Sequence, residues 1–324
     1  MRAWRVLRLM RPVLLALLSL LLLTGAARAG GGSIRAFVLL PSEGRLAIVD
    51  VQSGHLARMV VVPRGAGPVA ASVDGSRVLV ANTRRGVVIE IDGRTGRRLH
   101  LFGGLGRPVD LALVPRAEFG LVRPRYAVVA DANGWVDFLD LEHGRVVRRV
   151  SVSHPVALAL SDPQLWVASA GSRVLTQLDV SDVTEARVVA RPDAGVVAAA
   201  LAPDPSGLAV DVVCRDGRLI RVQAVSLARR LVGHLNGMTS QLLTGYQGIV
   251  WAAQTNGRVL GMRAGTDRVV AVMHVPAASR VAIVGGWLAA AHDRSIRMLV
   301  LGSNRRGTTF SLPGTVGAFS FAVF

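Results

Sequence analysis

The sequence predicts an all-β fold, a seven-bladed β-propeller of four-stranded antiparallel blades, and two observations support this prediction. The stretch from Arg77 to Pro115 contains four short apolar runs separated by turns rich in Gly, Asn, Asp and Pro. Short runs rich in Val and Ile between such turns are typical of strands in a meander. Units of this kind recur along the chain, and a sheet that cannot bury both faces alone must stack on copies of itself.

The most regular landmark of each unit is a turn between two apolar runs. Counted at the last residue of each turn, successive turns are 42, 48, 38, 45, 40 and 38 residues apart. The longest spacing contains an insertion, Glu118–Arg125, whose proline and charges are typical of a surface loop. Seven landmarks at this spacing predict seven blades. The turns are Pro41–Gly44, Asn82–Gly86, Asp131–Gly134, Ser169–Ser172, Cys214–Gly217, Gln254–Gly257 and His292–Ser295.

The two ends of the chain indicate how the ring closes. The first unit enters at Ala36–Leu40 and lacks the strand that precedes this run in the other units. The chain ends with Val316–Phe324, which matches the innermost runs at Val69–Val73 and Val109–Val114. We therefore expect the C-terminal strand 316–324 to complete the first blade as its innermost strand. Such closure removes open sheet edges, which otherwise promote aggregation.

A second turn in four units begins with an aspartate at a strand end: Asp50, Asp92, Asp140 and Asp179. In the first three units a glycine follows four residues later. Aspartate can accept hydrogen bonds from the backbone amides of its own turn, and glycine supplies the positive φ that closes the turn. We interpret these aspartates as turn residues. A metal site would require their carboxylates to lie close together, whereas these turns are expected to lie far apart around the ring.

The segment VLVANTRRGVVIEIDGRTGRRL (78–99) resembles the YVTN-type repeat of exported bacterial and archaeal propellers, whose consensus reads V-Y-V-x-N…G-x-V-x-V-I-D…T-x-x-V. The match is good in the second blade, fair in the first, third and fourth, and weak from the fifth on, where Gln223, Arg263 and Leu301 stand near the usual Asp. The resemblance implies a fold and not a reaction. Its relatives include non-catalytic envelope proteins, lactonases and propeller domains of redox enzymes. The fold alone does not distinguish between these functions.

The N-terminus has the form of a signal peptide. Four arginines precede the apolar run Val13–Leu23, and Ala27-Arg28-Ala29 is an A-x-A cleavage site. The run is much shorter than the roughly 20 residues that span a bilayer, although an uncleaved anchor is the alternative. We therefore expect residues 1–29 to be a signal peptide, 30–33 a short linker and 34–324 the propeller, exported to the periplasm or the medium.

Composition limits the possible functions. All 38 basic residues are arginine, and the formal charge is +17, of which the signal segment carries five arginines and no acid. The excess of arginine over acidic residues predicts an anionic partner, or it reflects a coding bias towards Arg, Ala, Val and Gly. Nucleic acid is disfavoured, because aromatic residues are only 5% and the arginines are scattered. Cys214 is the only cysteine, which excludes an intramolecular disulfide and haem c attachment.

Strand alternation predicts where a site would lie. With four strands per blade, the first turns listed above share a face with the loops that link consecutive blades. Propellers commonly bind ligands at the mouth of the central channel, so this face is our site hypothesis. The linking loops are Gly65–Pro68, Gly103–Pro108, Ser153–Pro155, Asp193–Gly195, Gly233–Gly237, Pro276–Arg280 and Pro313–Thr315.

Nine polar residues on this face are candidate ligand-binding residues, among which Arg107 and His154 rank first because each precedes the proline of an inner strand. The histidines lack the compact spacing of a metal motif, so we expect no metal and no cofactor. No G-x-S-x-G elbow is present, and we assign no catalytic residue. The candidates are Arg84, Arg107, Asp131, His154, His234, Asn236, Arg280, His292 and Asp293.

Two functions are consistent with these residues. The first is a non-catalytic exported propeller, monomeric and without a membrane span in its mature chain, that binds a protein or an anionic envelope component. The alternative is a lactonase- or lyase-like enzyme, which needs an acid–base pair within bonding distance, for example His154 or His234 with Asp131 or Asp293.

Overall fold

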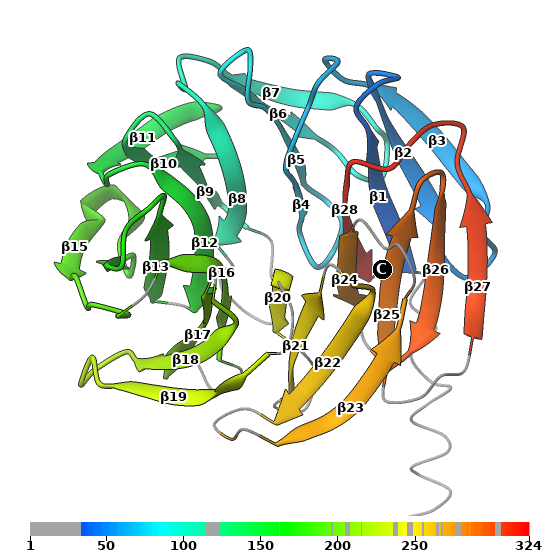
Figure 1. Ribbon diagram of the computed structural model, residues 1–324. Coiled ribbons are helices and arrows are strands. Elements are labelled where there is room, and N and C mark those ends of the chain that lie inside the picture. The colour runs from blue at the N-terminus through cyan, green and yellow to red at the C-terminus, as the bar shows by residue number, and fades with distance from the viewer. Residues whose placement is uncertain are drawn as a thin grey trace, which may run out of the picture. The chain divides into compact units, whose positions relative to one another are not determined.

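The computed structural model describes residues 34–323, except for 115–123, 162, 196, 205–207, 215, 236–238, 245–248, 255, 264–265, 267, 276–279, 285 and 302–305. The expected signal peptide and linker, most of the insertion 118–125, Asn236 and Phe324 lie outside the described residues. Within these residues the strands form seven antiparallel sheets of four strands, which confirms the predicted fold (Figure 1).

Every blade has the same order of strands, from the channel outwards. The innermost strands are β28 (Ala318–Val323), β4 (Val69–Ala71), β8 (Pro108–Val114), β12 (Pro155–Ser161), β16 (Ala198–Pro203), β20 (Thr239–Thr244) and β24 (Arg280–Val284). The second strands are β1 (Ile34–Leu40), β5 (Val78–Asn82), β9 (Tyr126–Asp131), β13 (Gln164–Ser169), β17 (Ala209–Cys214), β21 (Ile249–Gln254) and β25 (Trp287–His292).

The two outer strands complete each blade. The third strands are β2 (Arg45–Asp50), β6 (Val87–Ile91), β10 (Trp135–Asp140), β14 (Leu175–Asp179), β18 (Arg218–Gln223), β22 (Arg258–Arg263) and β26 (Ser295–Val300). The outermost are β3 (Leu56–Val61), β7 (Arg98–Phe102), β11 (Arg145–Ser151), β15 (Arg187–Ala190), β19 (Arg229–His234), β23 (Val269–His274) and β27 (Arg306–Ser311). A single-turn 3-10 helix, η1 (Val183–Glu185), precedes β15.

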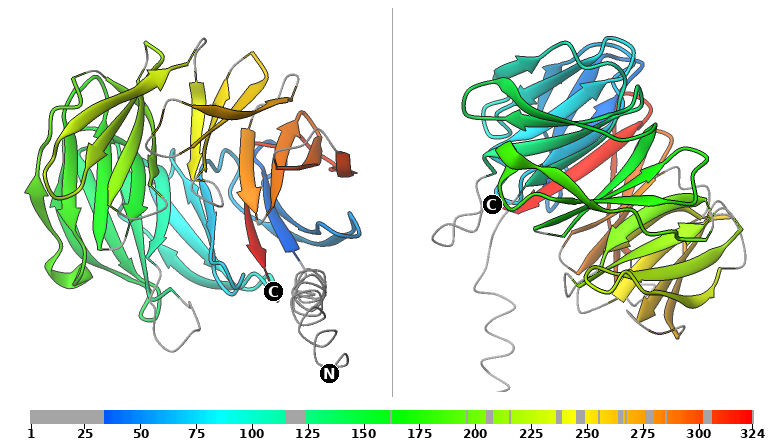
Figure 2. Two further views of the ribbon diagram at one scale, coloured as in Figure 1. Left: turned by 90° about the horizontal axis from the view of Figure 1, so that it is seen from below. Right: turned by 90° about the vertical axis from the view of Figure 1, so that its left-hand side faces the viewer.

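The C-terminal strand closes the ring as expected. β28 pairs antiparallel with β1, from Ile34 opposite Val323 to Leu39 opposite Ala318, and the two strands lie side by side (Figure 2). The innermost strands of neighbouring blades contact each other around the channel, and the contact between β24 and β28 joins the last blade to the first. The first blade therefore contains both ends of the propeller chain.

Each interface between neighbouring blades has its own apolar core. Seven clusters of buried side chains occupy the seven interfaces of the described propeller. Strand β1 contributes to two of them, because successive side chains point to opposite faces of a sheet. Val38 packs towards the seventh blade and Phe37 towards the second. Both faces of the middle strands are buried, which explains why these strands are continuous apolar runs in the sequence.

The aspartates of the second turns hold those turns closed, as predicted. The Asp92 carboxylate accepts hydrogen bonds from the Arg94 and Thr95 amides at 2.9 and 2.7 Å, and Asp50, Asp140 and Asp179 accept equivalent bonds. Gly54, Gly96 and Gly144 have φ near +70°. The backbone and side-chain hydrogen bonds from Ser53 lower the pKa of Asp50, so its contribution to stability is lost only as pH falls through this lowered value.

Cys214 is buried at the end of β17, as expected for a small apolar residue. Burial raises the pKa of its thiol to about 12, so the reactive thiolate is scarce at neutral pH. In the described part of the chain, no helix has the length and hydropathy that crossing a bilayer requires.

Removing residues 317–324 tests the closure. This truncation deletes β28 with Phe319 and Phe321, which pack on the core between the last and first blades, and it exposes the inner edge of β1. We expect a loss of at least about 5 kcal/mol in the free energy of unfolding and aggregation through the open edge. Thermal unfolding and gel filtration measure both, with removal of Phe324 alone as the control. A monomeric truncated chain of unchanged Tm would contradict the closure.

Candidate functional site

The channel opens into a cavity on the face that the sequence indicated. We call this the mouth face; it comprises the turns between second and third strands and the loops that link the blades. The cavity has a volume of about 390 Å³ and is lined from the first, second, third and seventh blades. Pro68, Val69 and Phe319 contribute apolar side chains to its walls. Small-molecule sites commonly combine such walls with a few polar groups.

Asp110, on β8, is an acidic residue that lines this cavity. Its Oδ1 accepts a hydrogen bond from the Leu111 amide at 2.9 Å, and its Oδ2 accepts one from the Leu158 amide of the next blade at 2.8 Å. Burial raises the pKa of Asp110 to about 6, although the two amides and the charge of Arg280 act to lower it. A carboxyl group with this pKa can exchange protons near neutral pH.

Arg280 lines the same cavity from β24 of the seventh blade. It is exposed, and within the described residues its guanidinium makes no hydrogen bond and no ion pair. Arg280 and Asp110 lie on strands separated by the first and second blades, so the two charges face the cavity from different sides. Of the sequence-predicted candidates, Arg280 is the one that lines this cavity.

The structure places the candidate histidines on loops and at strand ends around the mouth, all exposed. His154 has φ of 41°, and its Nδ1 lies 3.1 Å from the Ser153 hydroxyl. In the described part of the chain, no contact joins His154 or His234 to a carboxylate. The acid–base pairs that a lactonase-like site would need are therefore not formed by these two histidines in this structure.

Asp131 is buried, and its carboxylate is occupied by backbone amides. It accepts hydrogen bonds from Gly106, Arg107 and Asn133 at 2.6, 2.7 and 2.9 Å. These bonds fix the loop that links the second and third blades and thereby position Arg107. Asp131 thus acts within the loop, whereas the adjacent Arg107 side chain is exposed.

The other candidates are spread around the mouth face. Arg84 is exposed in the turn after β5, His292 is exposed at the end of β25, and Asp293 is exposed in the turn that follows. Asp293 has φ of 48°, and its Oδ1 accepts a bond from the Thr315 hydroxyl at 3.3 Å. Asn236 lies outside the described residues. The candidates therefore surround the cavity without forming one cluster.

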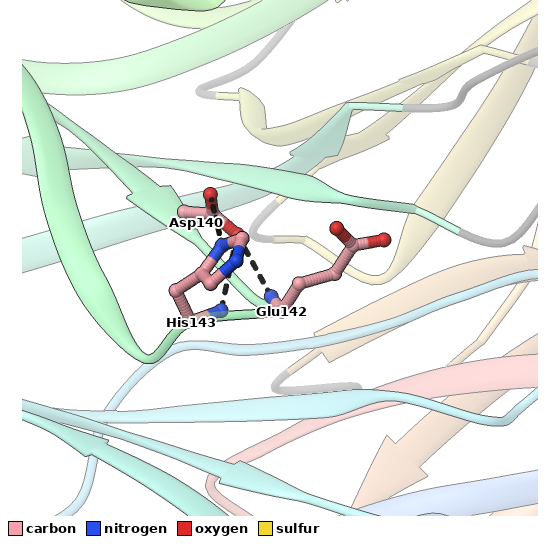
Figure 3. Close-up of side chains that lie close together, drawn as sticks. All are labelled: Asp140, Glu142 and His143. Carbon is pink, nitrogen blue, oxygen red and sulfur yellow. Dashed lines mark hydrogen bonds and ion pairs between the residues drawn. The ribbon is translucent and has the colours of Figure 1, made fainter.

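One side-chain cluster on the opposite face has donor types that bind metals. Asp140, Glu142 and His143 gather in the turn after β10, where His143 Nδ1 lies 2.9 Å from Asp140 Oδ2 (Figure 3). Asp140 also accepts the amides of its own turn. The Arg125 guanidinium lies 3.3 Å from Glu142 Oε2 and 3.6 Å from Asp140 Oδ2. The Arg125 guanidinium neutralises the carboxylates, and the hydrogen bonds within the turn explain why the three side chains lie together.

Ion pairs with buried carboxylates cross-link strands within the blades. Arg221 on β18 binds both oxygens of Asp211, at 2.8 and 2.7 Å, and also contacts Asp204. Arg149 Nε lies 2.5 Å from Asp137 on β10. Burial raises the pKa of Asp137 and Asp211, while their arginine partners act to lower it. Each charge is compensated within its own blade, so these pairs are structural.

Asp110 is the residue of the cavity that the sequence prediction missed. The third blade begins its inner strand with Pro-Val-Asp-Leu-Ala-Leu (108–113), and the fourth with Pro-Val-Ala-Leu-Ala-Leu (155–160). Asp110 therefore places a charged residue at the position where the neighbouring blade has Ala157. That substitution within an apolar repeat is the signal that could have identified it.

Solved structures with the same architecture share little sequence with this chain. A functionally unknown protein from Desulfotomaculum acetoxidans DSM 771 gives a TM-score of 0.75 at 10% identity, over 89% of this chain and 98% of that one. Apo AztD from Citrobacter koseri gives 0.66 at 14% identity, over 90% and 98%. The dihydro-heme d1 dehydrogenase NirN, solved in complex with DHE, gives 0.64 at 13% identity, over 88% and 74%.

Identities this low show the fold alone. No family model matches the chain, and no curated protein matches its sequence. The structural comparisons therefore establish a β-propeller, and the resemblance to the YVTN-type repeat stays a prediction.

The pKa of Asp110 predicts how stability depends on pH. Because the folded pKa is raised, Asp110 stabilises the fold below its ordinary pKa of 3.8, and this contribution is lost as pH rises through about 6. Over that range the wild type should lose up to about 3 kcal/mol relative to Asp110→Asn. Arg280 is the charged group that acts on Asp110, and Asp131 on the adjacent β9 is bound to amides.

Urea unfolding of both proteins at pH 4 and pH 7 measures this difference. Carboxyl-carbon NMR gives the pKa directly. A titration of Asp110 below pH 4.5, with equal stability changes in the two proteins, would contradict the prediction.

Proposed function

We propose that this protein is an exported, non-catalytic propeller that binds an anionic ligand or a protein at the mouth face. The observation that supports this proposal is the excess of exposed arginine around a cavity that itself contains an unpaired guanidinium in the described part of the chain. The form of residues 1–29 supports the proposed export, because they carry a basic region, an apolar run and an A-x-A site.

The balance of charge differs between the two faces, because exposed arginines occur on both while acids are fewer on the mouth face. Arginines outnumber acids on the mouth face, where Asp131 is buried and Asp216 is paired with Arg218 at 2.7 Å. The exposed arginines are Arg64, Arg84, Arg85, Arg107, Arg173, Arg191, Arg280 and Arg294, and the described acids of these turns and loops are Glu43, Asp131, Asp193, Asp216 and Asp293. The turns of the opposite face include Asp50, Asp74, Asp92, Asp140, Glu142, Asp179, Asp182, Glu185 and Asp204.

This distribution favours an anionic ligand. Guanidinium groups bind carboxylates, sulfates and phosphates through paired, charge-assisted hydrogen bonds. A surface with one sign of charge also raises the local concentration of ligands of the opposite sign. The coding-bias explanation accounts for the use of arginine in general, but it does not account for the concentration of acids on the opposite face.

Replacing four mouth-face arginines tests the proposal. The variant Arg84→Gln, Arg85→Gln, Arg107→Gln and Arg280→Gln should bind dextran sulfate, and vesicles of anionic lipid, at least about tenfold more weakly, since each arginine near an anionic surface contributes about 1 kcal/mol. Titration calorimetry and vesicle sedimentation measure the two probes. The matched control carries Arg97→Gln, Arg98→Gln, Arg145→Gln and Arg268→Gln on the opposite face and has the same net charge. Equal losses in both variants would contradict a mouth-face site.

The enzymatic alternative is favoured by one observation, the raised pKa of Asp110 inside the cavity. A panel of lactones tests it. If the alternative holds, hydrolysis should depend on pH with an inflection near pH 6, and Asp110→Asn should reduce kcat by at least about a hundredfold. Glu43→Gln, an exposed acid of the same face outside the cavity, is the control. A panel without turnover would contradict the alternative and leave the binding proposal in place.

A further inference from the structure

The charged groups of the mouth cavity narrow the class of ligand that the proposed function leaves open. Among its lining residues, Asp110 and Arg280 are the two that carry charge, and the rest are apolar residues, glycines and prolines. The two side chains come from the third and seventh blades. Val69 of the second blade and Phe319 of the first lie along the cavity wall between these blades. The cavity therefore has an acidic and a basic residue on different blades, with apolar side chains such as Val69 and Phe319 between them.

The Asp110 carboxylate is held in position by backbone contacts. Each of its oxygens accepts one backbone hydrogen bond. The donors are the amide of Leu111 within β8 and the amide of Leu158 on the neighbouring β12. A carboxylate oxygen has a second lone pair, so each oxygen can still accept a hydrogen bond from a ligand. The position of the group is thus fixed by two strands, while part of its bonding capacity is unused within the described residues.

The Arg280 guanidinium complements it. It is exposed, and within the described residues it makes neither a hydrogen bond nor a direct ion pair with Asp110. The charges of Arg280 and Asp110 nevertheless interact across the cavity. A ligand that inserts between them can therefore bind each group without first breaking a salt bridge between the two.

We propose that the mouth cavity binds a small zwitterionic ligand, with its cationic group at Asp110, its carboxylate or other anionic group at Arg280, and an apolar body between them against Val69 and Phe319. This inference rests on the proposed function and makes it more specific. A purely anionic ligand would satisfy Arg280 but would leave Asp110 facing an apolar group or a like charge, both of which are unfavourable. A ligand with both charges satisfies both poles of the cavity.

Titration calorimetry of the full chain with matched probes tests the inference. The probes are the ω-amino acids 4-aminobutyrate, 6-aminohexanoate and 8-aminooctanoate, with hexanoate and hexylamine as the analogues that carry one charge. We expect one ω-amino acid to bind at least about tenfold more tightly than hexanoate and hexylamine, because each charge-assisted contact contributes about this factor. The length that binds best reports the separation of the two charges.

Two variants assign the contacts. Asp110→Asn should lower the affinity of the best ω-amino acid to that of hexanoate, and Arg280→Gln should lower it to that of hexylamine. Asp110→Asn keeps the shape of the side chain, and Glu43→Gln serves as the control acid outside the cavity. Circular dichroism verifies that each variant is folded. If a variant fails to fold, the order of the affinities of the five probes for the wild-type protein tests the inference.

Two results would overturn the inference. Hexanoate binding as tightly as every ω-amino acid, with no effect of Asp110→Asn, would mean that the cavity recognises only the anion. Absence of binding by all five probes at millimolar concentration would mean that the cavity is not a small-molecule site. Neither result affects the dextran sulfate and vesicle measurements, so failure of this inference is distinguishable from failure of the proposed function.

Discussion

The constraint on which this structure depends is that each blade must be covered on both faces. A middle strand such as β1 places Phe37 on one side and Val38 on the other, and both side chains are fully buried. No blade can satisfy this requirement alone, because its two faces pack on two different neighbours. A row of such sheets would leave two uncovered faces at its ends. Only a closed ring removes both, so the pairing of β28 with β1 is required by the same burial that holds each pair of blades together.

Closing the ring creates a second requirement at the channel. The inner edge of each innermost strand carries backbone amides that have no ladder partner, and such groups need another acceptor. Polar side chains of the adjacent blade supply two of these acceptors. The Ser320 hydroxyl accepts the Ala71 amide at 3.1 Å, and the Asp110 carboxylate accepts the Leu158 amide at 2.8 Å. Serine fulfils this role without a charge. Aspartate fulfils the same role and also brings a titratable group to the cavity. Of these two acceptors, Asp110 can therefore exchange protons or bind a charged ligand, whereas Ser320 carries no charge.

The architecture was predictable from the sequence because it depends on patterns that each strand and turn carries locally. Glycine at the turn positions and aspartate at the strand ends mark the repeat, and Gly96 and Asp92 have the conformation and hydrogen bonds that their residue types favour. Which turns and loops share the mouth face followed from strand alternation alone. The site residues were less predictable. Asp131 is polar and lies at the mouth, yet its carboxylate binds three loop amides, and this depends on a loop conformation that periodicity does not specify. Asp110 was missed because it lies within a strand, whereas the prediction considered only loops.

The position of the final strand has a consequence for the order of events during synthesis. The partner of β1 is β28, so the first sheet of the ring pairs residues separated by almost the entire length of the domain. Blades that contain only neighbouring segments can assemble while the ribosome is still elongating the chain, but the first blade cannot be completed before β28 has been synthesised. Contacts over such sequence separations form slowly. Completion of the ring therefore waits for the synthesis of β28, and a nascent chain terminated before this strand would keep an unpaired β1 edge that chaperones and proteases could recognise.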